Sequence, residues 1–226
     1  MAIRWMLGLA LVWATVMASG FFASAARADE AVMPGIRVED ENTKCTAGFA
    51  AQGADGSYYL MTSGHCNRHD GSPWTYGDEV PLGKISVSEE EGDKRDAAII
   101  LLEPSVGAPL GHVGGRYPVR DVMSLSQVEV GMPFCKIGAV TGETCGVVKS
   151  TAGGVVEASV FSLTGDSGSP GFVKNPDGTV SAVGLLMSSP DGDDYTTYFV
   201  PSIHCSVSGA CMFSSEVRQR AFHRKA

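Results

Sequence analysis

Basic side chains, helical periodicity and long apolar runs are all scarce in this sequence of 226 residues. Lysine and arginine together number 17, against 25 aspartate and glutamate residues. Nucleic acids and anionic membrane surfaces bind clusters of basic side chains, so this acidic balance argues against both, and we expect neither partner. No two of the six cysteines form a CxxC pair, which argues against a zinc site or a thioredoxin-like redox site.

Only one apolar run approaches the length that crosses a membrane, and it lies at the N-terminus. Residues 5–26 are almost wholly apolar, Arg4 precedes them, and a small-x-small pattern follows at residues 26–28. This arrangement predicts a signal peptide over residues 1–28, with an uncleaved membrane anchor as the alternative. We therefore expect a secreted, extracellular protein, in contact with the cell envelope or free of it. Once the leader is removed, we expect no stable membrane association.

The chain that follows the leader is acidic and contains all the cysteines. Two of the 17 basic residues lie in the leader, so 15 remain against 25 acidic ones, a formal net charge of −10. An even number of cysteines behind a secretory leader is typical of a disulfide framework. The six cysteines therefore predict three bridges, and their spacing alone leaves the pairing open.

Short runs of β-branched, aromatic and apolar residues alternate with glycine-rich turns along the chain. Examples are residues 57–62, 97–102, 155–161 and 180–188. This pattern favours an antiparallel β barrel or sandwich over βαβ units. A glycine- and proline-rich connector at residues 103–120 separates two halves of similar length.

Three short motifs contain residues suited to acyl transfer. MTSGHC places His65 after an apolar strand, DAAII opens another strand with Asp96, and GDSGSP surrounds Ser167 with glycines. A serine hydroxyl becomes a nucleophile when a histidine takes its proton, and an acid orients that histidine. Gly165 leaves the backbone free to direct its own N–H, with that of Ser167, at an oxyanion. Each motif alone is an ordinary turn or strand end, but all three in this order favour a catalytic set.

These motifs resemble those of the chymotrypsin-fold serine proteases, most closely the streptogrisin-like bacterial branch. The segments CTAGF, CKIGAVTGETCG and TTYFVPS resemble the same branch, so the likeness extends from about Cys45 to Ser202. More narrowly, the chain is similar to secreted mycobacterial and actinobacterial serine proteases with short N-termini. The resemblance implies an all-β chain of two six-stranded antiparallel β-barrels, with the active site in the cleft between them.

The resemblance also implies how the chain is divided. The N-terminal barrel would cover residues 29–116 and the C-terminal barrel residues 117–211, followed by a tail, frayed or briefly helical, over residues 212–226. We expect a monomeric endopeptidase that acts on polypeptides through an acyl-enzyme. His65 would be the base, Asp96 would orient it and Ser167 would attack. No metal and no organic cofactor is implied.

The pairing of the cysteines follows from the same resemblance. It implies the bridges Cys45–Cys66, Cys135–Cys145 and, by elimination, Cys205–Cys211. Streptogrisins have a further bridge beside the specificity pocket, where this chain has FSLT at residues 161–164. The shape of that pocket is therefore expected to differ.

Support for the catalytic loop is expected from a buried ion pair. An ionised Asp166 beside the nucleophile needs a partner, because an unpaired buried carboxylate is unfavourable. The bacterial branch places a basic side chain after the hairpin cysteine, where this chain has Lys136; a solvated Lys136 is the alternative. Ser188 matches the serine that hydrogen-bonds the catalytic acid. The substrate-binding positions implied are Phe161, Ser162, Thr164 and Ser189.

Three other classes of protein compete with this interpretation. An α/β-hydrolase would need the order Ser, Asp, His and a glycine where Ser169 stands. A structural β protein would leave the three motifs unexplained. The main alternative is a chymotrypsin-fold binding protein with weak or latent catalysis. The missing pocket bridge favours it, as does the absence of room for a folded pro-domain between the leader and Cys45.

Overall fold

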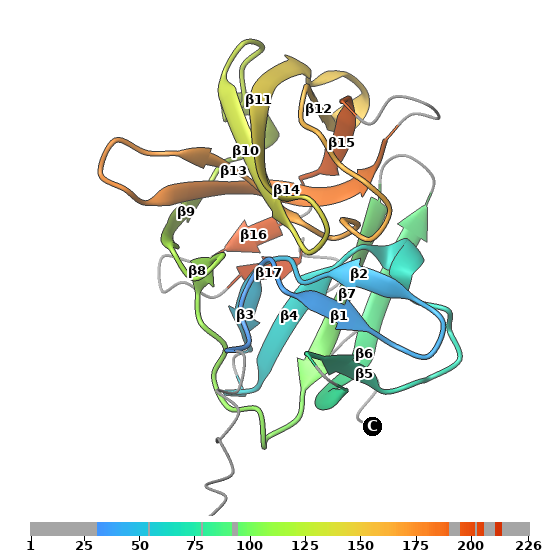
Figure 1. Cartoon of the computed structure of the whole chain (residues 1–226). Helices are drawn as coiled ribbons and strands as arrows, with labels where there is room; N and C mark the ends of the chain where they lie inside the picture. Colours follow the sequence, from blue (N-terminus) through green and yellow to red (C-terminus); the bar gives the residue numbers. More distant parts are fainter. Residues whose placement is uncertain are drawn as a thin grey trace, which may run out of the picture.

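The computed structural model describes residues 31–53, 55–77, 79–91, 95–189, 195–201, 203–205 and 211–213. Within this part of the chain, two curled β-sheets, one short hairpin and a few 3-10 turns make up the regular structure (Figure 1). The leader predicted over residues 1–28 and the tail beyond residue 213 lie outside the described residues. No helix among the described residues is long and apolar enough to cross a membrane.

The first sheet has seven strands from the N-terminal half, in the spatial order β2-β1-β5-β6-β7-β4-β3. Their bounds are β1 Arg37–Glu39, β2 Lys44–Thr46, β3 Ala50–Gln52, β4 Tyr58–Thr62, β5 Trp74–Tyr76, β6 Val80–Glu91 and β7 Arg95–Leu102. Alternating apolar residues of these strands point inward, so the sheet curls round a core that includes Leu60, Trp74 and Ile100. A bulge between Ile85 and Val87 bends the long β6–β7 pair.

The second sheet has eight strands, in the order β13-β10-β11-β12-β15-β14-β9-β8, and a further β13–β14 pairing closes six of them into a barrel. Their bounds are β8 His112–Val113, β9 Tyr117–Val122, β10 Pro133–Gly138, β11 Gly142–Ser150, β12 Val156–Ala158, β13 Pro170–Lys174, β14 Val180–Ser188 and β15 Thr197–Val200. β9 pairs with β14 in parallel, whereas the other pairings are antiparallel. Phe134 and Phe199 pack edge to face in the barrel core, with ring centroids 4.7 Å apart.

The predicted all-β fold of two barrels is confirmed, with one difference in the first sheet. Only the second sheet closes, whereas the first is a curled half-barrel whose edge strands β2 and β3 are not paired with each other. At one edge, the backbone N–H of Thr46 donates to the carbonyl of Ser167 in the second half of the chain (2.8 Å). The edge of β2 therefore contacts the other half of the molecule. The β8–β9 hairpin, with Val113 opposite Tyr117, spans the boundary predicted after residue 116.

Candidate active site

The backbone of the first sheet brings His65 and Asp96 together. β4 leads into a 3-10 turn, η1 (Gly64–Cys66), that contains His65, and β7 begins one residue before Asp96. Because Thr62 of β4 pairs with Ala98 of β7, the end of one strand lies beside the start of the other. His65 Nδ1 lies 2.8 Å from Asp96 Oδ2, and the His65 backbone N–H donates to Asp96 Oδ1 at 2.7 Å.

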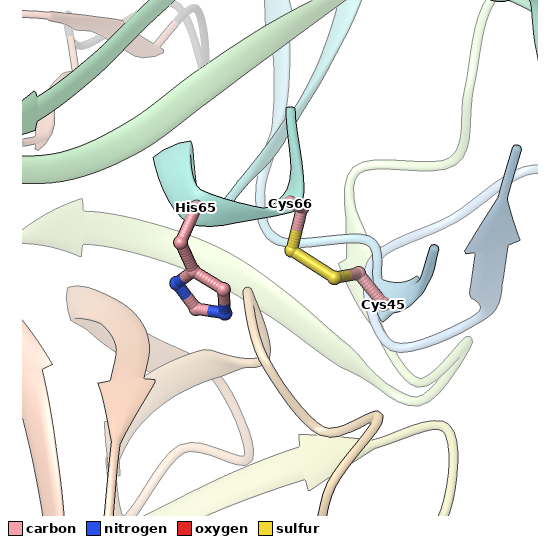
Figure 2. A group of neighbouring side chains, drawn as sticks. All are labelled: Cys45, His65 and Cys66. Carbon is pink, nitrogen blue, oxygen red and sulfur yellow. A yellow bond between two sulfur atoms is a disulfide. The ribbon is translucent and has the colours of Figure 1, made fainter. Parts of the chain in front are cut away.

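The environment of the pair determines the protonation of the imidazole. Asp96 is 2% exposed, so water does not compete for its oxygens. An ionised carboxylate only accepts hydrogen bonds, so Nδ1 of His65 carries the proton and Nε2 of the neutral ring is left as a base. The hydrogen bond with Asp96 raises the pKa of His65 above its ordinary value, although burial opposes the shift. Figure 2 shows the ring of His65 projecting from η1 beside the Cys45–Cys66 disulfide.

Ser167 lies in the loop between β12 and β13, which tight backbone turns shape. The N–H of Asp166 donates to the carbonyl of Leu163, and the N–H of Ser169 donates to that of Asp166, each at 2.9 Å. The N–H of Gly168 donates to Leu186 of β14 (2.8 Å), which attaches the loop to the closed barrel. The loop therefore holds Ser167 in a partly exposed position.

Three polar groups of this loop remain without a partner among the described residues. They are the Ser167 hydroxyl and the backbone N–H groups of Gly165 and Ser167. In the same part of the chain, no hydrogen bond joins the hydroxyl to His65; such bonds are often loose before substrate binds. Gly165 has a φ of 98°, and a Cβ there would lie 2.8 Å from Val140 Cγ2, so the position requires glycine. The two N–H groups can donate to an incoming oxygen.

Residues of the first sheet and of the turn after β4 also hold this loop in place. The hydroxyl of Thr46 donates to the carbonyl of Gly165 (2.8 Å) and accepts from the N–H of Ala139 (3.0 Å). The hydroxyl of Ser63, two residues before His65, donates to the carbonyl of Leu186 (2.6 Å). The structure therefore brings the His65–Asp96 pair and the Ser167 loop to one junction between the two sheets.

Asp166 is fully buried beneath the loop and accepts hydrogen bonds from several donors. Lys136 Nζ lies 3.2 Å from Oδ2, and the Thr141 hydroxyl donates to the same oxygen at 2.6 Å. The backbone N–H groups of Val140, Thr141 and Leu163 donate at 3.0, 3.2 and 3.1 Å. Lys136 is also fully buried, so the two charges neutralise each other away from water.

Burial and hydrogen bonding act in opposite directions on this pair. Burial alone would raise the pKa of Asp166, but the Thr141 hydroxyl, the backbone donors and Lys136 hold it below its usual value. Burial lowers the pKa of Lys136, and its contacts with Asp166 oppose that shift. The carboxylate is therefore ionised, as a buried group with this many donors should be.

Ser188 does not reach Asp96 in this structure. Its side chain is exposed, and among the described residues it forms no hydrogen bond. The cause is a β-bulge in the β14–β15 pairing between Leu186 and Ser188, which redirects the side chains at the end of β14. The hydroxyl of Ser63 is buried, but it donates to Leu186 and not to Asp96.

The expected substrate-binding positions have different environments. Ser162 is 2% exposed and hydrogen-bonds both Ser189 and Thr197, at 2.7 and 2.9 Å between hydroxyl oxygens. The ring of Phe161 packs on Tyr195, with centroids 4.9 Å apart. Thr164 is exposed. Ser162 and Ser189 thus belong to one polar cluster, which also includes Thr197, a residue that the sequence did not indicate.

Two of the three expected disulfides are formed. Cys45–Cys66 links β2 to η1 directly beside His65 (Figure 2), and Cys135–Cys145 joins opposing positions of β10 and β11. The third expected pair, Cys205 and Cys211, is opposed in the hairpin of β16 (Ile203–Cys205) and β17 (Cys211–Phe213), but its side chains lie outside the described residues.

Two groups of side chains among the described residues have the spacing of metal ligands. They are Cys45, His65 and Cys66, and Cys135, Glu143 and Cys145. In each group the two sulfurs are bonded to each other, and a disulfide sulfur is not the thiolate that binds a metal. Neither group can therefore bind a metal while its disulfide is intact.

Sequence reasoning did not indicate Thr46 or Thr141, although both contact the Ser167 loop. Thr141 lies in the segment CKIGAVTGETCG, and Thr46 follows Cys45 in CTAGF. Nothing in the local pattern marks either threonine, because the hydrogen bond from Thr46 to Gly165 joins residues 119 positions apart.

No protein-family model matches the chain. Among curated sequences, it is similar to uncharacterized proteins of two Mycobacterium tuberculosis strains. Each is 28% identical over 186 or 187 residues, which cover 76% of this chain and 81% of the relative.

Solved structures of bacterial serine proteases are similar to the chain. Thermobifida fusca protease A matches with a TM-score of 0.60 and 22% identity, over 75% of this chain and 91% of that one. An alpha-lytic protease homolog, N4, matches with a TM-score of 0.60 and 27% identity, over 75% and 92%. Cellulomonas bogoriensis chymotrypsin matches with a TM-score of 0.57 and 26% identity, over 75% and 91%. The chain therefore has the chymotrypsin-like two-barrel fold, and its structural neighbours are bacterial serine proteases of that fold.

Proposed function

We propose that the chain is a secreted serine endopeptidase that hydrolyses peptide bonds through an acyl-enzyme on Ser167. The observation that carries the proposal is the His65–Asp96 pair, 2.8 Å apart with Asp96 buried, at the same junction as an unbonded Ser167 hydroxyl. The structural neighbours support a protease of the chymotrypsin fold. The disulfides fit an oxidising, extracellular environment.

In the proposed reaction, Ser167 Oγ attacks the carbonyl carbon of the scissile peptide while His65 Nε2 takes its proton. The oxygen of that carbonyl becomes an oxyanion, which accepts hydrogen bonds from the N–H groups of Gly165 and Ser167. Asp96 stabilises the imidazolium without taking its proton. As the C–N bond breaks, the imidazolium returns the proton to the leaving amine. Water then attacks the acyl-enzyme by the same sequence of proton transfers.

The supporting residues have a separate role in this proposal. Lys136 and Asp166 hold the loop from beneath, so that the N–H groups of Gly165 and Ser167 keep their direction. This matters because an oxyanion hole acts through donors that are oriented before the reaction begins. Cys45–Cys66 restrains the turn that contains His65 in the same way.

A fluorophosphonate probe, which reacts with activated serines, tests the proposal on the secreted and oxidised protein. We expect the probe to label Ser167. The labelling should be lost in Ser167→Ala and should be at least about 100-fold slower in His65→Ala. His112→Ala is the matched control, since His112 is an exposed histidine on β8. The absence of labelling in a folded, disulfide-bonded protein would refute the protease proposal and favour a binding protein of this fold.

A further inference from the structure

We propose that three linked hydroxyls, Ser162, Ser189 and Thr197, make the enzyme prefer substrates whose P1 side chain donates hydrogen bonds. P1 is the residue on the acyl side of the scissile bond. The preference would be for glutamine or lysine over glutamate. This inference rests on the proposed protease function and names its substrate class.

The three hydroxyls, here called the hydroxyl cluster, form an unbroken chain of hydrogen bonds. Ser189 Oγ lies 2.7 Å from Ser162 Oγ, which lies 2.9 Å from Thr197 Oγ1. Thr197 Oγ1 donates in turn to the backbone carbonyl of Val160 at 2.6 Å. Thr197 and Ser162 are 0% and 2% exposed, whereas Ser189 is partly exposed and is the member that a substrate can reach.

The carbonyl of Val160 sets the direction of every proton in this chain. A carbonyl oxygen only accepts, so the single proton of Thr197 points to it. Ser162 must then donate to Thr197, and Ser189 must donate to Ser162. All three protons are used inside the cluster, and Ser189 presents only the lone pairs of its oxygen. A P1 side chain therefore finds an acceptor, which suits an amide N–H or an ammonium and disfavours a carboxylate.

Backbone connections place the hydroxyl cluster beside the reacting serine. The N–H of Gly168 donates to Leu186, and the N–H of Leu186 donates to Ser169, so β14 runs alongside the catalytic loop. Ser189 lies three residues past Leu186, and Ser162 lies five residues before Ser167. The cluster thus joins the end of β14 to the segment that leads into the Ser167 loop.

The surroundings of the hydroxyl cluster point in the same direction. Among the described residues, no basic side chain hydrogen-bonds any of the three hydroxyls. Next to Ser162, the rings of Phe161 and Tyr195 contact each other at a tilt of 41°, and the face of an aromatic ring attracts cations and N–H groups but not carboxylates.

Paired peptide substrates that differ only at P1 test the inference, with glutamine against glutamate. These side chains have the same shape and differ in whether the end donates or only accepts. We expect kcat/KM for glutamine to exceed that for glutamate by about tenfold. The glutamine amide donates one hydrogen bond to Ser189, whereas the glutamate carboxylate finds no donor there. A lysine substrate should be cleaved at a rate nearer to glutamine than to glutamate.

Two substitutions leave one hydroxyl proton of the cluster without an acceptor, and both should reduce the ratio of kcat/KM for glutamine to that for glutamate. Ser162→Ala removes the acceptor of the Ser189 proton. Thr197→Val removes the acceptor of the Ser162 proton, so Ser162 can donate to Ser189 instead. In either variant the Ser189 hydroxyl is then able to donate to a glutamate side chain. Thr197→Ser keeps the chain of hydrogen bonds and is the matched control, with the wild-type ratio expected. Fluorophosphonate labelling of Ser167 in each variant shows that the catalytic residues remain in place, because the probe has no P1 side chain.

The outcomes separate this inference from the function on which it rests. A ratio near ten in wild type and Thr197→Ser that falls toward one in Ser162→Ala or Thr197→Val supports it. A labelled wild type that cleaves glutamate as well as glutamine, cleaves neither, or keeps its ratio in both proton-releasing variants overturns the inference and leaves the protease function standing. A wild type that the probe does not label overturns both.

Discussion

In the proposed reaction, His65 acts as a base only when its ring is neutral, so its pKa would set the acid limit of activity. The hydrogen bond with Asp96 raises that pKa above the ordinary value of 6.5, burial opposes the shift, and the charge of Glu90 adds to the increase. Activity should therefore fall as the pH drops through a midpoint above 6.5, because the proton then occupies Nε2. The rate of probe labelling between pH 5 and 9 measures the midpoint.

Two carboxylate variants separate the contributions to this pKa. Asp96→Asn should lower the midpoint and reduce kcat by on the order of 10⁴, since the amide no longer holds the imidazole in the required tautomer. Glu90→Gln should lower the midpoint by a smaller amount with an unchanged rate at high pH, because Glu90 acts on His65 through charge alone. A midpoint that stays the same in Asp96→Asn would contradict the assigned hydrogen bond.

At the scale of structural elements, the β10–β11 hairpin supports the Ser167 loop through Lys136. Replacing this residue, as in Lys136→Met, leaves Asp166 buried without a cation, and we expect the free energy of unfolding to fall by about 3–5 kcal/mol at pH 7. The double variant Lys136→Met/Asp166→Asn should recover part of that loss, because it removes the uncompensated charge. Urea denaturation at pH 7 measures both differences.

The same pair predicts how stability depends on pH. The pKa of Asp166 lies below its usual value of 3.8 in the folded protein, so its contribution is present above that value and is lost as the pH falls through the folded pKa. The penalty of Lys136→Met should shrink in acid, since a protonated Asp166 needs no cation. A penalty that is equal at pH 7 and pH 3 would show that Lys136 contributes through packing and not through charge.

Short motifs indicated His65, Asp96 and Ser167, and the resemblance to the bacterial branch indicated Lys136, because a motif depends only on the few residues around each side chain. Ser188 was not predictable, since its direction depends on the bulge between β14 and β15 and not on its own strand. A sequence pattern assumes a continuous register, and a bulge shifts every side chain beyond it. The open edge of the first sheet was not predictable either. Its edge strand β2 bonds to the other half of the molecule, and the pattern of that strand does not show this contact.

At the scale of the whole molecule, the candidate site is shared between two sheets that the sequence keeps far apart. The first sheet provides His65 and Asp96, and the second provides the Ser167 loop, so the geometry depends on how the halves are joined. Thr46 contributes to this junction through its hydroxyl and its backbone N–H. No local pattern predicts such a contact, because it forms only when both halves are packed together.

Thr46→Val keeps the shape of this residue and removes the hydroxyl, which leaves the carbonyl of Gly165 and the N–H of Ala139 without partners. We expect stability to fall by about 1–3 kcal/mol for each group left unpaired, and labelling of Ser167 to slow by about 10–100-fold as the N–H of Gly165 is displaced. Thr46→Ser should restore both properties. Leu82→Ala, a cavity in the core of the first sheet, should lower stability by about 2–5 kcal/mol without slowing the labelling. If Leu82→Ala slows labelling as much as Thr46→Val does, the effect comes from lost stability, and the hydroxyl of Thr46 does not position the loop.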